Sequence, residues 1–503
     1  MVAALIADKM RPGMILFSVV VLFLCAGILT PKEMLEGFSN KGMITVALLF
    51  LVSEGIRQSG TLGQVIKKLL PQGKTTVFKA QLRILPSVAF ISAFLNNTPV
   101  VVIFAPIIKH WAKSVNLPAT KFLIPLSYVT ILGGICTLIG TSTNLVVHGM
   151  ILEAGFEGFS MFELGKVGVF IAIAGIIYIF LFSKRLLPDA RPDTAVPDEE
   201  IEEGEKFHRV EAVLGARFPG INKKLKDFNF QRHYGAEVKE IKTRNGQRFV
   251  TNLDDVVLHE GDTLVVMADD TFIPTWGESS VFVLLTNGNE PDTSGKKKRW
   301  FALLLLVLMI VGATVGELPV TKEMFPDIKL DMFFFVSITT IIMAWTNLFP
   351  ARKYTKYISW DILITIACAF AISKAMVNSG VADSVAKFII GLSDDYGPHV
   401  LLAMVFIITN LFTELITNNA AAALAFPLAL SISAQLGVSP TPFFVVICMA
   451  ASASFSTPIG YQTNLIVQGI GNYKFTDFVR IGLPLNIITF LISVILIPLI
   501  WNF

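Results

Sequence analysis

Charged residues are scarce in this chain. Only 16% of its 503 residues are Asp, Glu, Lys or Arg and 53% are hydrophobic, which is too apolar for an ordinary soluble protein. The formal net charge is +3 and the basic residues are scattered through short loops, so no basic surface of the kind that binds nucleic acid is expected. The composition therefore excludes a soluble enzyme and a nucleic-acid-binding protein and favours a membrane protein.

The sequence also lacks the groups that catalysis and metal binding require. Its six histidines form no H-x-x-x-H pair, and no Ser-His-Asp or Cys-His set and no Gly-rich phosphate loop is present. The cysteines fall in apolar segments without C-x-x-C spacing, which is typical of small buried side chains: Cys25, Cys136, Cys368 and Cys448. We expect neither an enzyme nor an organic cofactor.

Long apolar runs, by contrast, fill both ends of the chain, and most are long enough to cross a hydrocarbon core of roughly 30 Å as a helix. Met1–Ala7 is too short to do so, and no cleavable signal peptide is evident. The sequence predicts an all-α polytopic membrane protein with helical segments at Met14–Leu29, Met43–Ile56, Ile84–Ile108, Lys121–Cys136, Gly168–Phe182, Trp300–Gly316, Leu330–Leu348, Ile362–Met376, Val400–Leu436, Pro442–Ser454 and Ile481–Trp501.

A polar segment separates the two apolar halves. Strand-like pieces at Ala236–Ile241 and Thr263–Met267 alternate with turn signals at 244–247 and 259–262, which indicates a small α/β insert. Lys184 and Arg185 precede it and a basic run at 296–299 follows it, so the positive-inside rule places the insert in the cytoplasm of a cell-membrane (plasma or inner membrane) protein. The expected domains are 1–190, 198–290 and 299–503.

The two apolar halves are repeats of each other. Thr137–Asn144 and Thr457–Asn464 share a T-x-I-G-x-x-T-N pattern at an offset of 320 residues. Each half also carries an Asn-Asn pair inside an apolar run, at Asn96-Asn97 and at Asn418-Asn419. An internal repeat with polar clusters at matching places in an apolar chain is typical of secondary transporters.

The polar clusters interrupt helices. In the first half Pro99 follows directly on Asn96-Asn97-Thr98, and proline disfavours continuous helix. We therefore expect tips at 96–99 and 417–419 and turns at 137–144 and 457–464, as helical hairpins or broken helices. Such breaks offer free N–H groups to anions and free carbonyls to Na⁺, while Asn and Thr add neutral donors and acceptor oxygens.

Three charged residues lie within or near the ends of apolar runs. Glu54 and Lys374 occupy equivalent repeat positions near helix ends, where snorkelling or pairing and a functional role are both open. Glu414, beside the second tip, is the better functional candidate because an antiporter would need a titratable carboxylate there.

At these motifs the chain resembles the divalent anion:sodium symporter family, the SLC13-type permeases of the ion transporter superfamily. The resemblance implies two inverted repeats with re-entrant hairpins, a dimerising scaffold and a transport domain that moves as an elevator. It implies one Na⁺ site at Ser92, Asn96, Asn97 and Gly140, and a second at Thr413, Ile416 (through its carbonyl), Asn418 and Gly460. The implied substrate ligands are Asn97, Thr98, Thr141, Ser142, Thr417, Asn418, Asn419, Tyr461 and Gln462.

The glycine-containing turns differ from those of dicarboxylate carriers. After the glycines this chain has Thr-Ser-Thr and Tyr-Gln-Thr rather than a Thr-Pro-Pro-like sequence, which resembles the proposed sulfate carriers of the family. The insert resembles a TrkA-C (RCK C-terminal) domain at 234–238 and 258–266, and a domain of that kind would bind a small regulatory ligand or mediate dimer contacts.

Together these features predict a Na⁺-coupled symporter of a small divalent oxyanion, with sulfate the first candidate. The partners expected are Na⁺ as co-transported ion, the anion, the lipid bilayer and a second copy of the chain. The alternatives that stay open are di- or tricarboxylate symport, cation/proton antiport or arsenite export, an anion channel or sensor gated by the insert, and, least favoured, a membrane enzyme.

Overall fold

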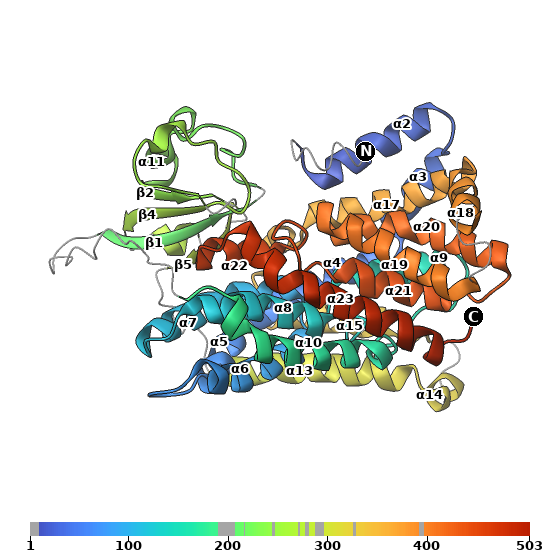
Figure 1. Cartoon of the computed structure of the whole chain (residues 1–503), viewed down its shortest axis with the longest axis horizontal. Coiled ribbons are helices and arrows are strands. Elements are labelled where there is room, and N and C mark those ends of the chain that lie inside the picture. The colour runs from blue at the N-terminus through green and yellow to red at the C-terminus, as the bar shows by residue number, and fades with distance from the viewer. Residues whose placement is uncertain are drawn as a thin grey trace.

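The computed structural model describes residues 10–189, 207–215, 217–243, 247–269, 272–276, 281–286, 296–324, 328–391 and 397–503. Within them, two sets of helices form the membrane part and a small sheet lies at one side (Figure 1). The predicted short segment Met1–Ala7, the predicted domain boundaries at 190 and 198 and most of the predicted turn at 244–247 lie outside the described residues.

The first half of the chain is helical throughout. Its main helices are α2 (Pro12–Cys25), α3 (Pro31–Glu36), α4 (Lys41–Gln58), α5 (Thr61–Leu69), α6 (Val77–Ser92), α7 (Asn97–Ser114), α8 (Leu123–Gly134), α9 (Ser142–Glu153) and α10 (Gly165–Leu186). The second half repeats the pattern with α13 (Lys296–Gly316), α14 (Pro319–Met324), α15 (Met332–Trp345), α16 (Tyr354–Tyr357), α17 (Trp360–Asn378), α18 (Val381–Gly391), α19 (Gly397–Leu415), α20 (Asn418–Leu436), α21 (Thr441–Ser452), α22 (Gln462–Gly471) and α23 (Phe475–Ile500).

Among the described residues, seven helical segments are long and apolar enough to cross a membrane. This agrees with the predicted polytopic α-helical class. The segments are Pro31–Gln58, Gly165–Leu186, Lys297–Gly316, Trp360–Asn378, Gly397–Leu415, Asn418–Leu436 and Phe475–Ile500. Three helices that adjoin the motifs are strongly enclosed: every residue of α8 is buried, as are nearly all of α21 and most of α20. A helix that is apolar all round belongs inside a helical assembly, so the repeated motifs lie in the interior.

Two predicted spans are shorter than the sequence suggested. The first was expected to run to Leu29, but α2 ends at Cys25 because Gly27 adopts a left-handed backbone (φ 71°). Thr30 then caps α3 together with Glu33 in a capping box. In the second half α15 ends at Trp345 rather than Leu348, and Asn347 is left-handed (φ 53°). Both helices have 14 residues.

The breaks predicted at the motifs are present. The first tip lies between α6 and α7, and the second at Ile416–Thr417, between α19 and α20. The turns lie between α8 and α9 and between α21 and α22. Pro99 itself does not break a helix, since it lies in the first turn of α7, where its missing N–H has no intrahelical partner to lose.

The insert is a five-stranded antiparallel sheet of order β3-β2-β4-β1-β5. Its strands are β1 (Phe207–Leu214), β2 (Glu237–Lys242), β3 (Arg248–Phe249), β4 (Thr263–Asp269) and β5 (Phe282–Thr286), with short helices α11 (Phe230–Tyr234) and α12 (Phe272–Trp276). The strand-like pieces in the sequence correspond to β2 and β4. An aromatic core of its own, including Phe218, Phe228 and Tyr234, stabilises the insert, and its sheet lies beside α22 and α7 (Figure 1).

A buried lysine closes the end of the helix that leads to the insert. Lys121 is 2% exposed, and its Nζ donates to the carbonyls of Lys184 (2.8 Å) and Leu187 (2.5 Å) at the end of α10. A cation at a helix C-terminus satisfies carbonyls that have no intrahelical partner.

We predict that Lys121→Met lowers the free energy of unfolding by about 2 kcal/mol, because two buried carbonyls lose their donor. Thermal unfolding of the detergent-purified protein measures the change. Lys184→Met, at an exposed position of α10, is the matched control and should leave the midpoint unchanged. Equal midpoints for the two variants would contradict this role of Lys121.

Candidate functional site

Four helices of the membrane part begin at the repeated motifs. They are α7, α9, α20 and α22, preceded by Asn96, Thr141, Thr417 and Tyr461, and none of these residues makes a side-chain capping hydrogen bond. Helix α7 packs against α22 and α9 against α20. No N-cap side chain therefore occupies the first N–H groups at the positive end of these helices, although the N–H of Asn464 in α22 donates to the carbonyl of Tyr461 at 3.0 Å.

The first tip meets the second turn. Asn97 Nδ2 donates to the hydroxyl of Tyr461 at 2.6 Å, and Thr98 Oγ1 donates to Gln462 Oε1 at 3.3 Å. The Tyr461 hydroxyl is also 3.0 Å from Thr141 Oγ1 and lies within hydrogen-bonding reach of Asn418. This buried phenol therefore joins both tips and both turns.

The second tip meets the first turn in the same way. Asn419 Oδ1 accepts from Thr143 Oγ1 at 3.1 Å and from Ser142 Oγ at 3.4 Å. Thr98 with Gln462 and Asn419 with Ser142 are thus equivalent contacts between the two repeats. Reciprocal contacts of this kind relate two parts of a structure by an approximate two-fold axis.

The hydrogen bonds show which residues of the two tips correspond to each other. Matching the two Asn-Asn pairs would equate Asn96 with Asn418. However, Ser92 Oγ donates to Asn97 Oδ1 and Thr413 Oγ1 donates to Asn418 Oδ1, both at 2.8 Å. Asn97 is therefore the counterpart of Asn418, because the same local hydrogen bond places each of them.

Oxygen atoms gather around the first tip. Ser92 Oγ lies 2.9 Å from the carbonyl oxygen of Thr130, and a Cβ atom on Gly140 would lie 2.5 Å from the carbonyl oxygen of Gly134 and 3.0 Å from that of Ala93. A Cβ atom on Gly134 would lie 2.7 Å from Asn97 Oδ1. Glycine at 134 and 140 thus lets neutral oxygens approach one another closely, as ligands of a hard cation must.

The second tip has an equivalent arrangement with more polar side chains. Thr413 Oγ1 lies 2.6 Å from the carbonyl oxygen of Ala451. A Cβ atom on Gly460 would collide with Ser454 Oγ and lie 2.5 Å from the carbonyl oxygen of Thr413. Ser454 stands where the first repeat has Gly134, so this cluster includes a hydroxyl that the first one lacks.

Both turns are held by side chains within the motif. Asn144 Nδ2 donates to the carbonyl of Thr137 at 2.9 Å, and Asn464 Nδ2 donates to those of Ser454 (2.9 Å) and Thr457 (3.1 Å). Ser127 Oγ donates to Asn464 Oδ1 at 2.7 Å. These residues were not among the predicted ligands, although the T-x-I-G-x-x-T-N repeat contained the signal for Asn144 and Asn464.

Glu414 lies at the edge of the second cluster. Its carboxylate accepts from the backbone N–H of Ser456 (2.9 Å) and from Asn486 Nδ2 (2.7 Å), and Ser454 Oγ is 3.4 Å away. The corresponding residue of the first repeat is Ala93, so only one tip has a carboxylate at this place. Nothing in the sequence pointed to Asn486, which lies in α23.

Glu54, in contrast, is paired with Arg57 in its own helix.

The structure does not place all predicted ligands in the network. Asn97, Thr98, Thr141, Ser142, Asn419, Tyr461, Gln462, Ser92, Thr413 and Asn418 take part in the hydrogen bonds given above, and Gly140 and Gly460 line the oxygen clusters. Asn96, Ile416 and Thr417 lie beside it at the tips, with Ile416 buried and Thr417 exposed. In the part of the chain that the structure describes, no group of three or more His, Cys, Asp or Glu side chains could hold a metal ion.

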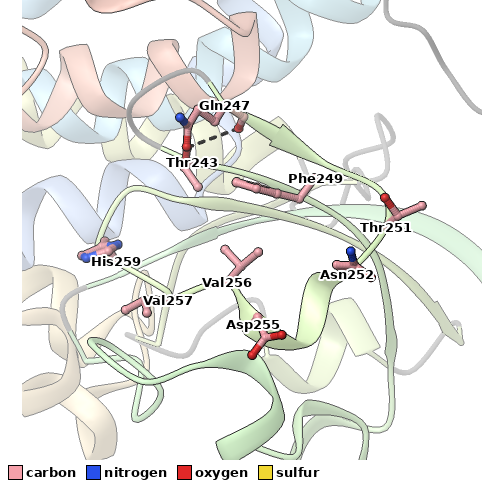
Figure 2. Close-up of a pocket in the computed structure, with 9 residues that line it drawn as sticks. All are labelled: Thr243, Gln247, Phe249, Thr251, Asn252, Asp255, Val256, Val257 and His259. Atoms are coloured by element: carbon pink, nitrogen blue, oxygen red, sulfur yellow. Dashed lines mark hydrogen bonds between the residues drawn. The ribbon is translucent and has the colours of Figure 1, made fainter.

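A separate hollow of about 610 Å³ lies on the insert, away from the tips. Figure 2 shows its lining, which is mostly neutral and hydrogen-bonding: Thr243, Gln247, Phe249, Thr251, Asn252, Asp255, Val256, Val257 and His259. The carboxylate of Asp255 is exposed, and hydrogen bonds from Lys226 and Lys224 lower its pKa.

Comparison with known proteins gives a family match over most of the chain. A family model described as citrate transporter matches residues 2–433 and, in a second alignment, residues 330–503. An uncharacterized transporter of Synechocystis is 30% identical, with 96% of this chain and 93% of the relative covered. That alignment runs over 570 positions, more than the 503 residues of this chain, so the relative has segments that this chain lacks.

Relatives from Chlamydomonas reinhardtii include proteins named for a substrate. A probable sodium/sulfate cotransporter 3 is 23% identical over 96% of this chain and 85% of its own length. Sodium/sulfate cotransporter 2 is 31% identical, but the match covers 56% of this chain and 31% of the relative.

We predict that Gly140→Ala lowers the free energy of unfolding by about 1–3 kcal/mol, because the new methyl group meets backbone atoms that cannot move aside. Thermal unfolding of the purified protein measures the change. Gly391→Ala is the matched control, since a Cβ atom there has nothing within 4 Å. A Gly140→Ala protein as stable as its parent would contradict the close approach of Gly140 to the backbone of Gly134 and Ala93.

Proposed function

The chain belongs to the citrate transporter family of membrane permeases, and on this premise we propose that it is a Na⁺-coupled symporter of a small divalent oxyanion, with sulfate the first candidate. The observation that carries the proposal is the meeting of four uncapped helix N-termini at the two tips and turns. Their free N–H groups and dipoles favour an anion without any Lys or Arg side chain among the site residues named above.

The anion in this proposal lies between the tips. Asn97, Thr98, Ser142 and Gln462 present amide and hydroxyl groups from both repeats there, and Tyr461 connects the two sides. These residues would donate hydrogen bonds to sulfate oxygens, with Thr141, Thr417, Asn418 and Asn419 completing the set. Breaking the contacts between tip and turn frees these same groups for the substrate.

The two oxygen clusters are the proposed Na⁺ sites. Ser92, Asn96, Asn97 and Gly140 belong to one site, and Thr413, Ile416, Asn418 and Gly460 to the other. Na⁺ favours neutral oxygens such as those of amides, hydroxyls and unwound backbone. Each Na⁺ would bind beside a tip that also contacts the anion. The positive charge of the ion would offset the negative charge of the substrate and so couple Na⁺ binding to anion binding.

The remaining features follow the family expectation. We propose a homodimer in the cell membrane, an elevator movement of the domain that holds the tips, and a cytoplasmic insert next to the basic residues at 296–299. The resemblance of the insert to a TrkA-C domain and a regulatory ligand for it also remain predictions. The hollow near Asn252 and His259 offers hydrogen-bonding groups for such a ligand.

We predict uptake of radiolabelled sulfate by proteoliposomes only when an inward Na⁺ gradient is present, because both cations must offset the charge of the anion. Succinate, citrate and thiosulfate serve as competitors. Asn97→Ala and Asn418→Ala, at equivalent positions of the two tips, should each reduce uptake at least tenfold, since each removes about 1.5–3 kcal/mol of hydrogen bonding to a charged partner.

The wild-type result separates the hypotheses. Sulfate uptake that ignores the Na⁺ gradient would remove the coupling, and uptake of succinate or citrate in place of sulfate would keep the mechanism and change the substrate. Empty liposomes and K⁺ in place of Na⁺ are the controls.

A cation/proton antiporter is the second candidate, because Glu414 gives the second cluster a titratable carboxylate. In a symporter this carboxylate only orients Ser456 and Asn486, so we predict that Glu414→Gln changes Na⁺-driven uptake by less than about tenfold, the worth of one hydrogen bond. An antiporter would lose all proton-coupled exchange in the same variant. Sulfate uptake and Na⁺-induced pH changes in the same proteoliposomes distinguish the two.

A further inference from the structure

The insert contacts the two helices that begin at one half of the proposed site. Helix α7 begins at Asn97 and α22 at Gln462, and the Thr98–Gln462 hydrogen bond joins their first turns. The sheet of the insert lies next to both helices (Figure 1). Its contacts with them are of two kinds, one ionic and one by close packing.

The ionic contact is an enclosed charge cluster. Lys109 Nζ, on α7, donates to both carboxylate oxygens of Glu211 on β1 at 2.9 Å, and Lys242 Nζ on β2 is 3.5 Å from Glu211. Burial of Glu211 acts to raise its pKa, but Lys109 and Lys242 outweigh this and hold the pKa at about 2. The counterpart of Lys109 in the second repeat is Leu430, so only the helix that meets the insert has this charge.

The packing contact is between the turn that leads into β4 and α22. A Cβ atom on Gly261 would lie 3.4 Å from a methyl group of Leu465, and a Cβ atom on Gly469 would collide with Thr263 Oγ1. Gln462 itself, a residue of the proposed site, borders a small gap together with Val213, Leu214, Glu260 and Gly261 of the insert. The insert therefore reaches the first turn of α22.

In the first repeat, the helix equivalent to α22 makes a different contact at the same place. Gly149 of α9 corresponds to Gly469 of α22, and a Cβ atom on Gly149 would lie 2.6 Å from Asn40 Oδ1. Asn40, the N-cap residue of α4, also donates to the carbonyl of Gly149 at 3.3 Å. On α22, Thr263 of the insert occupies the place that Asn40 has on α9.

We infer that the insert forms a permanent wall of the substrate site, positioning α22 against α7 and staying docked on both helices throughout the transport cycle. The inference rests on the proposed function for its transport readout. Lys109 and Glu211 are positioning residues here, because they act on the anion through the helices that begin at Asn97 and Gln462.

A disulfide across the packing contact tests whether the insert stays docked. Thr263→Cys with Gly469→Cys suits this, since a Cβ atom on Gly469 lies 3.7 Å from Thr263 Cβ, near the 3.8 Å mean of disulfides. The four native cysteines are replaced by alanine. We expect oxidation to link residues 263 and 469, seen by mass spectrometry, and the oxidised protein to take up sulfate at the rate of its reduced form.

Loss of uptake on oxidation, restored by dithiothreitol, would overturn the inference, because the insert would then have to leave α22 during the cycle. Failure of the disulfide to form would overturn the docking geometry itself. Linkage is read without transport, so a wild-type protein that shows no Na⁺-driven uptake would count against the proposed function and not against the docking.

Substitution at the ionic contact tests the positioning role. We expect Lys109→Met to raise the half-saturation concentration for sulfate about tenfold with little change in maximal rate, and Lys109→Arg to restore it. Lys113→Met, at an exposed position one turn further along α7, is the matched control. An unchanged half-saturation concentration in Lys109→Met would overturn the role of the insert in positioning α7.

Discussion

Backbone N–H groups at the start of a helix have no acceptor within that helix. In the hydrocarbon core of a membrane, water is not available to accept from them either. Four such starts meet in this protein, and their position depends on short side chains. Asn97 accepts from Ser92 and Asn418 from Thr413, so each tip is fixed from the preceding helix. The enclosure of α8 and α21 follows from the same requirement, because irregular backbone at this depth must be covered by protein.

The two halves have the same arrangement of helices and motifs but different side chains at equivalent positions. A single phenol, Tyr461, reaches from the second turn to the first tip, whereas the first turn has the smaller Thr141 at the equivalent place. Glu414 and Ser454 make the second oxygen cluster more polar than the first. The two proposed Na⁺ sites would therefore differ in field strength, which would give the two binding events different affinities.

Much of this could be predicted from sequence, because polar residues beside Gly or Pro in an apolar run cannot continue a lipid-facing helix. The breaks at both tips and the polytopic helical class were predicted on that basis and are present. The partners across the repeats could not be predicted: Asn97 and Tyr461 are 364 residues apart, and only packing brings them together. Asn486 carried no local signal either, and the early end of α2 depended on the left-handed conformation of Gly27.

The insert attaches to α7 and α22, and the counterpart helix α9 packs instead on the start of α4. A carrier built from two equivalent halves would have inward- and outward-facing forms of nearly equal energy. An attachment to one half alone removes the equivalence of the two halves, and every 1.4 kcal/mol by which the other contacts of the insert differ between the two forms would shift the resting population tenfold. In the proposed carrier, the sheet of the insert would thus help to determine which of the two forms is favoured at rest.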